Sequence, residues 1–595
     1  MMLWCTAVRR WATGAAIAAT AAPLAAQTVP HPGTGIAPPT REEINRLPTA
    51  TQATPRSRLT VSGGIERGPC PLDDPRYAGI TVTLTDVVFD GLQGVDPAPL
   101  RAAYAGAIGH PVPLATVCAI RDGAAAILRR QGYLAAVQVP PQRIGDGTIH
   151  LSVIMAKLVA IHVRGDTGHA ERLIAAYLDA LKDGQPFNQA VAERRLLLAG
   201  DLPGYEIRLA LRPAGTVAGE VVGDVIVSRM PLAVTINVQN YGSHAVGRWS
   251  GLATAELNDL VGLGDRAVIG VYNTADVHEQ SVVQAAYELR PGNSGLTLAG
   301  HFTYAWTRPD LGNGDPLRAR TLIGTVEASY PLIRRQAETL RLSGGLDIVD
   351  QRLRFGGAPF TEDRLRVLYG RADLSAIDPA SLADTTGYSA AEPRWRIAGS
   401  LEVRKGIAGL GASRDCGPSP YLRCFTLPSL SRLDADPQGA LIRLGGTIEL
   451  RPDPKFTIAI SPRAQYAFDP LLSYEQYSAG NYTVGRGYDA GALVGDSGYG
   501  MQNELRFGKL TPSSAKSLAV QPFLFVDAAW LWTRGALAGV RDPQRLYSAG
   551  GGVRAAWGDR ARLEVMLAAP LRRTPFESQR GDVRLLVNLT TRLLP

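Results

Sequence analysis

The 595-residue sequence has few of the residues on which metal sites and many enzymes depend. It contains five cysteines and eight histidines, with no CxxC spacing and no paired histidines that could bind zinc. It has no P-loop and no nucleophile beside a base, and Gly262-Leu-Gly264 is typical of a turn rather than a nucleotide-binding loop. We therefore expect no metal, no cofactor, no catalytic residue and no enzymatic activity.

Runs of one charge are also missing. The chain has 62 Lys and Arg against 54 Asp and Glu, a net charge of +8, and no basic run or basic–aromatic stripe accompanies this mild excess. Nucleic acid is therefore not an expected partner. Apolar residues make up 45% of the chain and charged residues 19%, a composition that excludes a disordered chain.

Long hydrophobic runs are absent beyond the N-terminus. Arg9, Arg10, the alanine-rich stretch 11–24 and the small residues that follow it predict a secretory signal peptide over residues 1–26. No later segment approaches the roughly 18 continuous apolar residues of a membrane-spanning helix. If the mature protein lies in a membrane, it must therefore cross it as a β-barrel.

The few cysteines are suited to disulfides, because a signal peptide directs the chain to an oxidising compartment. Cys5 leaves with the signal peptide, and the four remaining cysteines allow three pairings. We predict the two local pairs, Cys70–Cys118 and Cys416–Cys424.

Residues 27–77 form a linker rich in Pro, Thr, Gly and Arg. Within it, Thr40 and Glu43 form a capping box that opens a short helix, and Pro48 ends that helix. The remainder of this segment is interpreted as linker without secondary structure.

The next part of the chain contains a repeat. Residues 78–155 begin with an alternating strand at 80–87, continue with helical spacing at 97–108 and 114–130, and end with two strands. Residues 156–229 repeat the order strand–helix–helix–strand–strand. Two copies of about 75 residues predict two small α+β domains.

From residue 230 to 595 only strand signals remain. In residues 440–451, for example, Ile442 and Leu444 fall on one face and Arg443 and Glu449 on the other. Long strands with charges on one face are typical of a lipid-facing belt around a wet lumen. Sixteen segments are expected, near 231–241, 248–257, 265–274, 279–290, 295–307, 320–333, 338–353, 363–376, 394–405, 440–451, 456–468, 498–508, 517–532, 544–557, 560–571 and 582–593.

Connection lengths support this barrel, since outer loops are usually long and periplasmic turns short. Residues 308–319, 406–439 and 469–497 follow odd-numbered strands and are long, whereas most connections after even-numbered strands are short. The connection 377–393 is the exception, being long where a turn is expected.

The sixth outer loop, 469–497, holds a charge in a glycine-rich setting. Arg486 lies between Gly485 and Gly487 and beside Tyr488, so the backbone can bend tightly and let the guanidinium reach inward. The acids that follow in this loop, Asp489 and Asp496, are interpreted as turn formers.

A carboxylate in a later strand is the expected target of this arginine. Asp527 and Phe525 fall on the inward face of the segment 517–532. If the sixth loop folds into the barrel, Arg486 can form a bidentate pair with Asp527. The pair would hold the loop in one position, as a latch.

These features together resemble a known family. The stretches Gly132–Leu134, Pro140–Gly147 and Ile161–Gly165 resemble the junction of two polypeptide-transport-associated (POTRA) domains, and Cys70 and Cys118 match positions where many relatives carry a pair. Tandem POTRA domains before a sixteen-stranded barrel resemble the TpsB transporters of two-partner secretion, the hemolysin secretion/activation (ShlB/FhaC-type) family within the POTRA–barrel outer-membrane superfamily.

Two motifs carry the resemblance into the barrel. The family's sixth-loop Val-Arg-Gly-Tyr is matched by Val484 to Tyr488, with Gly485 as an extra residue. Its Phe/Gly-x-Asp-x-Gly strand motif is matched by Phe525 to Ala529, with alanine in place of the last glycine. The resemblance implies that Arg486, Gly487, Tyr488, Phe525 and Asp527 form the latch.

The resemblance also implies architecture and function. A mainly β protein is expected, with POTRA domains at 78–155 and 156–229 in the periplasm and a sixteen-stranded transmembrane barrel at 230–595 in the bacterial outer membrane. Its function would be two-partner (type Vb) export of a hemolysin- or adhesin-like exoprotein. Further implied partners are outer-membrane lipid and the barrel-assembly machinery. The alternatives are an outer-membrane assembly factor or insertase, and a passive porin.

Overall fold

A computed structural model describes the chain over residues 39–45, 58–61, 70, 72, 74–77, 79–182, 185–215, 217–310, 317–383, 387–419, 421–424, 426–535, 542–575 and 581–594. The predicted signal peptide, 1–26, and the expected helix end at Pro48 lie outside these residues. Within the described ranges, none of the helices has the length and hydropathy to cross a membrane.

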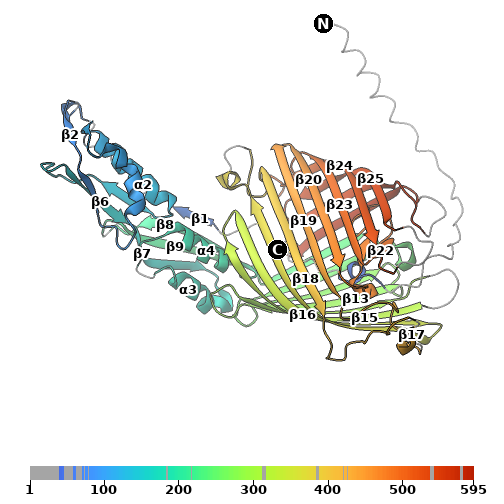
Figure 1. Cartoon of the computed structure of the whole chain (residues 1–595). Coiled ribbons are helices and arrows are strands. Elements are labelled where there is room, and N and C mark those ends of the chain that lie inside the picture. The colour runs from blue at the N-terminus through green and yellow to red at the C-terminus, as the bar shows by residue number, and fades with distance from the viewer. Residues whose placement is uncertain are drawn as a thin grey trace, which may run out of the picture.

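Two small sheet domains precede a barrel and lie at one end of it (Figure 1). The first sheet has the order β3-β6-β5, and the second has the order β1-β8-β9-β7. The elements of the first domain are η2 (Pro75–Tyr77), β2 (Thr81–Thr83), β3 (Asp86–Asp90), η3 (Ala98–Ala103), η4 (Ala105–Ala107), β4 (Pro111–Pro113), α2 (Thr116–Arg130), β5 (Ala135–Gln138) and β6 (Thr148–Met155). Those of the second are β1 (Arg58–Val61), β7 (Lys157–Gly165), η5 (Gly168–Ala170), α3 (Glu171–Asp179), α4 (Gln189–Gly200), β8 (Tyr205–Pro213) and β9 (Glu220–Arg229).

Each sheet domain has a core built from alternating strands and one face of a helix. In β6, Ile149, Leu151 and Val153 alternate with more exposed residues, and all three are buried. They pack against the apolar face of α2, which includes Ile120 and Leu128. Apolar residues recur at every second position of the strand and about every 3.6 positions of the helix. Both elements therefore direct apolar side chains into one core.

Three expectations for these domains need correction. The expected strand at 80–87 is divided into β2 and β3, and the expected helix at 97–108 consists of two short 3₁₀ pieces, η3 and η4. Tyr104 joins these pieces with φ −133°, outside the helical range. The third correction is β1, which lies in the expected linker and pairs in parallel with β8, from Arg58↔Arg208 to Val61↔Leu211.

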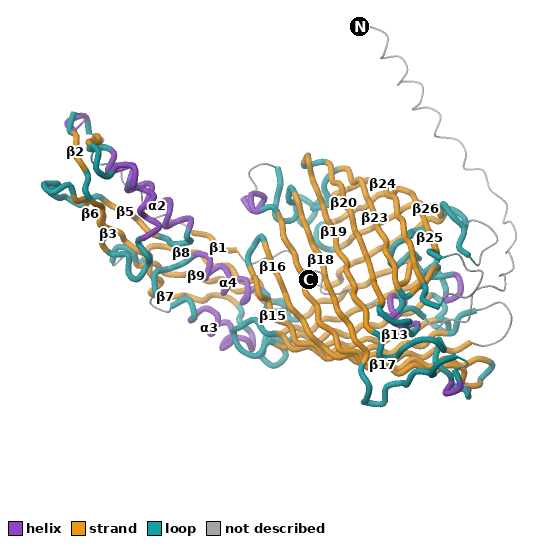
Figure 2. The backbone as a smooth tube through the Cα atoms, in the orientation of Figure 1, coloured by secondary structure: helices purple, strands orange, loops and turns teal. Residues whose placement is uncertain are grey.

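The barrel is closed and has the sixteen strands that the alternation predicts (Figure 2). All neighbouring strands are antiparallel, and β10 closes the wall by pairing with β27. The strands are β10 (Leu232–Gln239), β11 (Ser250–Asn258), β12 (Arg266–Thr274), β13 (Gln280–Leu289), β14 (Thr297–Thr307), β15 (Leu317–Arg334), β16 (Glu338–Phe355), β17 (Ala358–Ile377), β18 (Trp395–Gly406), β19 (Ala440–Asp453), β20 (Phe456–Ala467), β23 (Ser497–Phe507), β24 (Leu518–Trp532), β25 (Gln544–Trp557), β26 (Ala561–Pro570) and β27 (Arg584–Leu594).

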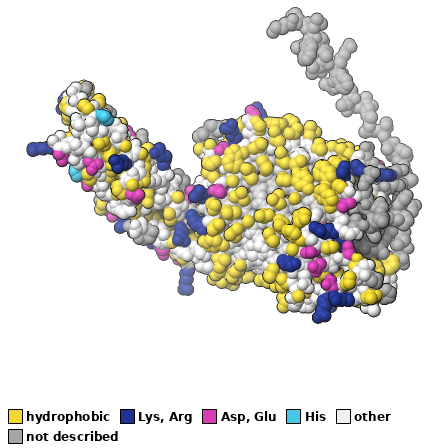
Figure 3. All heavy atoms as spheres, in the orientation of Figure 1, with side chains coloured by type: hydrophobic (Ala, Val, Ile, Leu, Met, Phe, Trp, Pro, Cys, Tyr) yellow, Lys and Arg dark blue, Asp and Glu magenta, His cyan; other side chains and the backbone are white. Residues whose placement is uncertain are grey.

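The outer wall is apolar and exposed, whereas the inner wall is covered. On β24, Leu524 and Val526 are 56% and 54% exposed, while Phe525 and Asp527, which alternate with them, are 3% and 0% exposed. The space-filling view shows the wall as a broad hydrophobic surface (Figure 3). So large an exposed apolar surface requires lipid around it.

Three neighbouring strands are longer than the sequence alternation indicates. β15, β16 and β17 have 18, 18 and 20 residues, so they reach beyond the lipid-facing band. The loop after β18 lies against the first half of β17, where Ile407 N–H donates to the carbonyl of Arg366. On the periplasmic side, the long connection after β17 contains η7 (Pro379–Ala383).

The short helix α1 (Arg41–Ile44) lies inside the barrel. Thr40 and Glu43 form the expected capping box. Ile44 is fully buried in a cluster of inward-facing barrel residues that includes Tyr272 and Val349. A segment from before the sheet domains therefore occupies the lumen of the domain that follows them.

Candidate functional site

The sixth outer loop, between β20 and β23, folds back into the barrel. It contains η9 (Ser473–Glu475) and a small hairpin of β21 (Tyr477–Ala479) and β22 (Leu493–Gly495). Val484 and Tyr488 from the loop pack with Leu531 and Leu546 of the wall. Apolar packing therefore brings the loop's charged tip to the inner face of β24 and β25.

Arg486 and Asp527 meet at that position. Arg486 Nε and Nη2 donate to the two oxygens of Asp527 at 3.0 and 2.6 Å, and the backbone N–H of Arg486 donates to the same carboxylate at 2.9 Å. Arg486 is 6% exposed and Asp527 is fully buried. The contact is thus bidentate, charge-assisted and shielded from water.

The flanking glycines make this approach possible. Gly485 and Gly487 have φ of +117° and +93°, values that other residues rarely adopt. A Cβ at Gly487 would also stand 3.0 Å from the carbonyl oxygen of Ala568. Gly485, the additional glycine in the motif, therefore supplies one of the two positive-φ positions that flank Arg486.

Phe525 contributes a ring rather than a polar group. Arg486 Cζ lies 3.8 Å from the centroid of the Phe525 ring, which is the geometry of a cation–π contact. The expected set of Arg486, Phe525 and Asp527 is thus brought together in one place.

Two further residues of the site were not assigned a role from the sequence. Arg486 Nη1 also contacts Glu504 of β23, and Arg554 of β25 donates to both oxygens of Glu504 at 2.8 and 2.9 Å. Arg554 stacks on Phe523 at 4.1 Å. Glu504 and Arg554 fall on the inward face of the two strands that pair with β24, and this position is the signal that could have identified them. Side chains that face each other on paired strands lie within contact distance.

Tyr488 fixes the loop through its hydroxyl to β25 and to the segment that follows β26. Its oxygen lies 2.8 Å from the carbonyl of Tyr547 and 2.6 Å from that of Arg572, and it accepts from Arg572 N–H at 3.1 Å. The single hydroxyl proton serves one carbonyl at a time.

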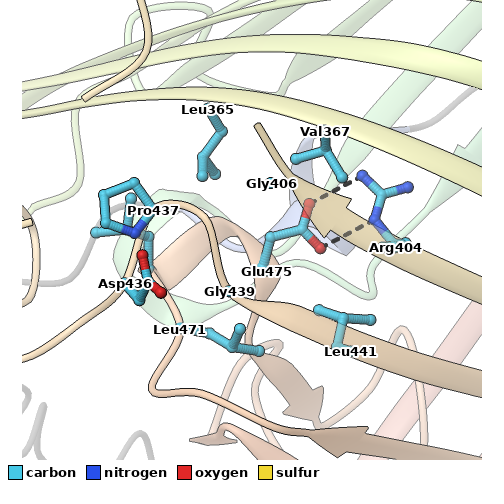
Figure 4. A pocket seen from close by; sticks show the side chains of 11 residues that line it. Leu365, Val367, Arg404, Gly406, Asp436, Pro437, Gly439, Leu441, Leu471 and Glu475 are labelled. Carbon is cyan, nitrogen blue, oxygen red and sulfur yellow. Dashed lines mark hydrogen bonds and ion pairs between the residues drawn. The ribbon is translucent and has the colours of Figure 1, made fainter. Parts of the chain in front are cut away.

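Glu475 anchors the start of the loop to β18 and β19 (Figure 4). Its carboxylate accepts from Arg404 at 2.9 and 3.1 Å and from Arg443 at 2.6 Å. Burial alone would raise the pKa of Glu475, but the charges of Arg404, Arg443 and Arg41 outweigh it and lower that pKa to about 2. A small hollow beside this cluster is lined by Leu365, Val367, Leu441 and Leu471, among others.

Two loop acids do more than shape turns. Asp496 is fully buried and accepts from Arg432 Nη1 at 2.6 and 2.7 Å. Asp489 accepts from Arg584 at 2.7 Å. Both acids therefore pair with distant arginines, because the folded loop brings them against other outer segments, which local turn chemistry could not indicate.

The helix α1 contacts the same loop. Ser478 Oγ donates to Glu42 at 2.8 Å, and Arg463 of the wall lies 3.6 Å from the same carboxylate. A Cβ on Gly491 would stand 3.1 Å from Thr40. The lumen is therefore filled by two elements, α1 and the sixth loop, that touch each other.

The four cysteines are joined as Cys70–Cys118 and Cys416–Cys424. The first bond ties the end of the linker to α2, and the second closes a small ring in the outer loop after β18. In the described part of the chain, no group of three or more His, Cys, Asp or Glu is placed to hold a metal ion.

The fold and site define a class of protein: an outer-membrane barrel with periplasmic sheet domains and a lumen closed by its own chain. Residues 224–555 match the family described as Haemolysin secretion/activation protein ShlB/FhaC/HecB, and residues 82–155 match the ShlB-type POTRA domain. The first match covers more than half of the chain, so this protein belongs to the ShlB/FhaC/HecB family.

Individual relatives agree with that assignment. The chain is 24% identical over 384 residues to the hemolysin transporter protein ShlB of Serratia marcescens, a match that spans 63% of each chain. The fold is similar to CdiB from Escherichia coli, with TM-score 0.69, 16% identity, and coverage of 89% of this chain and 94% of that one. CdiB from Acinetobacter baumannii gives TM-score 0.62 and 16% identity, with coverage of 90% and 94%.

Proposed function

We propose that this protein exports one partner exoprotein, of the hemolysin or adhesin kind, from the periplasm to the cell surface in two-partner secretion. The observation that carries the proposal is a membrane barrel of a secretion family whose lumen is closed by two parts of its own chain. A passive porin has no need of such closure. The family is one of transporters, and residues 78–155 and 156–229 are proposed as its two periplasmic POTRA domains.

The latch is proposed to hold the closed state. Arg486, Gly487, Tyr488, Phe525 and Asp527 keep the sixth loop against β24 and β25. Release of the loop must separate a buried, bidentate ion pair, so the bonded loop persists until a competing interaction replaces it. The loop and α1 must both shift before an extended chain can pass, because both occupy the lumen.

Capture of the exoprotein is proposed at a free sheet edge in the periplasm. β1 already occupies the outer edge of β8, whereas β7 has only β9 as a partner strand within the described residues. Val159 and Val163 of β7 are 40% and 43% exposed. An unfolded chain can add to this edge as a further strand, with main-chain hydrogen bonds supplying affinity. Lipid and the barrel-assembly machinery remain proposed partners.

Removing either charge of the latch tests the role of the sixth loop. In cells expressing the exoprotein, we expect Arg486→Ala and Asp527→Ala to reduce secretion strongly, because each leaves a buried, unpaired charge and a sixth loop that no longer has one defined position in the lumen. The matched control is Arg423→Ala, since Arg423 is an outer-loop arginine with a side chain 69% exposed. Barrel assembly is checked by heat-modifiable migration in gels. Normal secretion by both latch variants would contradict the role of the pair.

The insertase alternative has a separate test. Depletion of this protein is expected to remove one exoprotein from the medium and to leave the membrane content of other barrel proteins unchanged. A general loss of barrel proteins from the membrane would favour the assembly function instead.

A further inference from the structure

An arginine cluster lies on the outward face of the barrel, at the end away from the sheet domains. Arg318 and Arg320 are at the start of β15, and Arg352 and Arg354 are at the end of β16. All four side chains are exposed. We refer to these four residues as the rim arginines.

The rim arginines face the membrane side and not the lumen. They alternate with Leu317, Ala319 and Leu353, which are 1–3% exposed and form a cluster on the inner face. Farther along the same outward face of β15, Val326 and Leu332 are 64% and 53% exposed. Because successive strand residues point to opposite faces, the arginines continue the lipid-facing surface beyond its end.

The height of the apolar band places the cluster at the outer lipid boundary. Outward positions carry no charge from Leu322 to Leu332 on β15 or from Leu340 to Ile348 on β16. Ten residues of a tilted strand span about 25 Å of height, which matches the apolar band of an outer-membrane barrel. Arg320 also lies opposite Trp306, an exposed aromatic of the kind that marks the membrane interface.

The arrangement of the charges calls for an anion. Arg318 is paired across the strands with Arg354, and Arg320 with Arg352. Like charges directly opposite each other destabilise a sheet. Arg352 donates to Glu362 at 2.9 Å, but Arg318, Arg320 and Arg354 form no ion pair with any residue that the structure describes.

Glu362 cannot neutralise the cluster by itself. The carboxylate that accepts from Arg352 also accepts from Arg364, at 2.8 and 3.0 Å. Asp350, the nearest acid along β16, accepts from Arg366 at 2.7 Å. Figure 3 shows charged side chains gathered near this end of the barrel, beyond the apolar wall.

We propose that the rim arginines bind the phosphate groups of a phosphorylated glycolipid in the outer leaflet of the membrane. A guanidinium suits this ligand because its planar fork binds phosphate oxygens in a bidentate manner. Acyl chains of the same lipid would lie on the apolar surface formed by Val326 and its neighbours. A free phosphate could satisfy the arginines but would leave this adjoining apolar surface unused.

The inference rests on the outer-membrane orientation that the proposed function requires. Its test measures lipid binding and not secretion, so failure of one proposal is distinguishable from failure of the other. The purified full-length protein in neutral detergent is titrated with bis-phosphorylated lipid A, and bound lipid is counted by native mass spectrometry. Dephosphorylated lipid A and inorganic phosphate are the comparison ligands.

The test variant is the opposed pair Arg318→Gln/Arg354→Gln. We expect its affinity for lipid A to fall at least about tenfold, because charged hydrogen bonds to phosphate are lost. The control is Arg335→Gln/Arg423→Gln, which removes two exposed arginines at the periplasmic turn and in another outer loop; it should bind lipid A as the unaltered protein does. Heat-modifiable migration confirms that both variants are folded.

Three results would overturn the proposal. One is equal binding of lipid A and its dephosphorylated form. Another is an equal loss of affinity in the control variant, which would mean that only net charge matters. The third is full displacement of lipid A by inorganic phosphate at millimolar concentration, which would mean that the cluster is a phosphate site and not a lipid site.

Discussion

At the residue scale, the closed lumen depends on buried carboxylates that each accept several hydrogen bonds from arginine. Asp527 receives two side-chain bonds and a backbone bond from Arg486. Glu475 is shared by Arg404 and Arg443 on two neighbouring strands. A buried charge is tolerated only where it is paired and hydrogen-bonded, so these carboxylates set the position of the loop.

The pKa of Glu475 gives a prediction about acid. Because it lies near 2 in the folded loop against an ordinary value of 4.5, the stabilisation by Glu475 is complete above about pH 4.5 and is lost as pH falls toward 2. We expect single-channel conductance in planar bilayers to stay low from pH 7 to pH 5 and to rise below about pH 4. Glu475→Gln should raise conductance already at pH 7 and weaken the acid response.

The matched control for this experiment is Glu338→Gln, since Glu338 is the first residue of β16, at the periplasmic end of the barrel, with a side chain 39% exposed. It should leave the acid profile unchanged. If Glu475→Gln and the unaltered protein gave the same profile, another group would control the loop.

Sequence motifs indicate the centre of the site but not its surroundings. The order glycine–arginine–glycine and an acid in an apolar strand suffice to suggest Arg486 and Asp527 as partners. Glu504 and Arg554 belong to ordinary alternating strands, and their role arises only from barrel register. The pairing of Asp496 with Arg432 depends on the path of two long loops, which no local pattern specifies.

At the element scale, the regular alternation of apolar and polar residues made the barrel strands predictable. The elements that depart from this alternation could not be predicted in the same way. A strand with lipid on one side and water on the other must alternate, and sixteen strands follow from counting such segments. The extra length of β17 accompanies contacts with the loop after β18, such as that of Ile407 with Arg366. β1 has four residues and pairs with β8, about 150 positions away, so its own sequence carries little signal.

The position of β1 leads to a prediction about substrate capture. We expect a photo-crosslinking amino acid at Val163 on the free edge strand β7 to capture the exoprotein in cells, because main-chain pairing brings a new strand against that edge. The control is the same amino acid at Ile226, which is 58% exposed but lies on the central strand β9. Equal crosslinking at both positions would show contact with the sheet face and would contradict edge pairing.

At the scale of the whole molecule, the second sheet domain is fixed to the periplasmic end of the barrel. Asp201, at the end of α4, accepts from Arg334 of β15 at 2.7 and 2.6 Å. The hydroxyl of Tyr205 donates to Asp259 of the first periplasmic turn at 2.7 Å. Burial raises the pKa of Tyr205, and the neighbouring Asp259 raises it further, so this hydroxyl keeps its proton at physiological pH.

These contacts predict how rigidly the second sheet domain is held against the barrel. Arg334 has a side chain only 8% exposed, and losing a hydrogen bond to a charged group costs about 1.5–3 kcal/mol. With spin labels at Val191→Cys on α4 and Glu338→Cys on the barrel, Arg334→Ala should therefore broaden a narrow distance distribution. The control Arg212→Ala removes an ion pair within the sheet domain, whose side chains are 49% and 31% exposed, and should leave the distribution narrow. An unchanged distribution in Arg334→Ala would contradict this role of Arg334 and would mean that other contacts of α4 with the barrel, such as Arg194 with the carbonyl of Pro331 and Glu193 with Gln336 N–H, are sufficient to hold the domain.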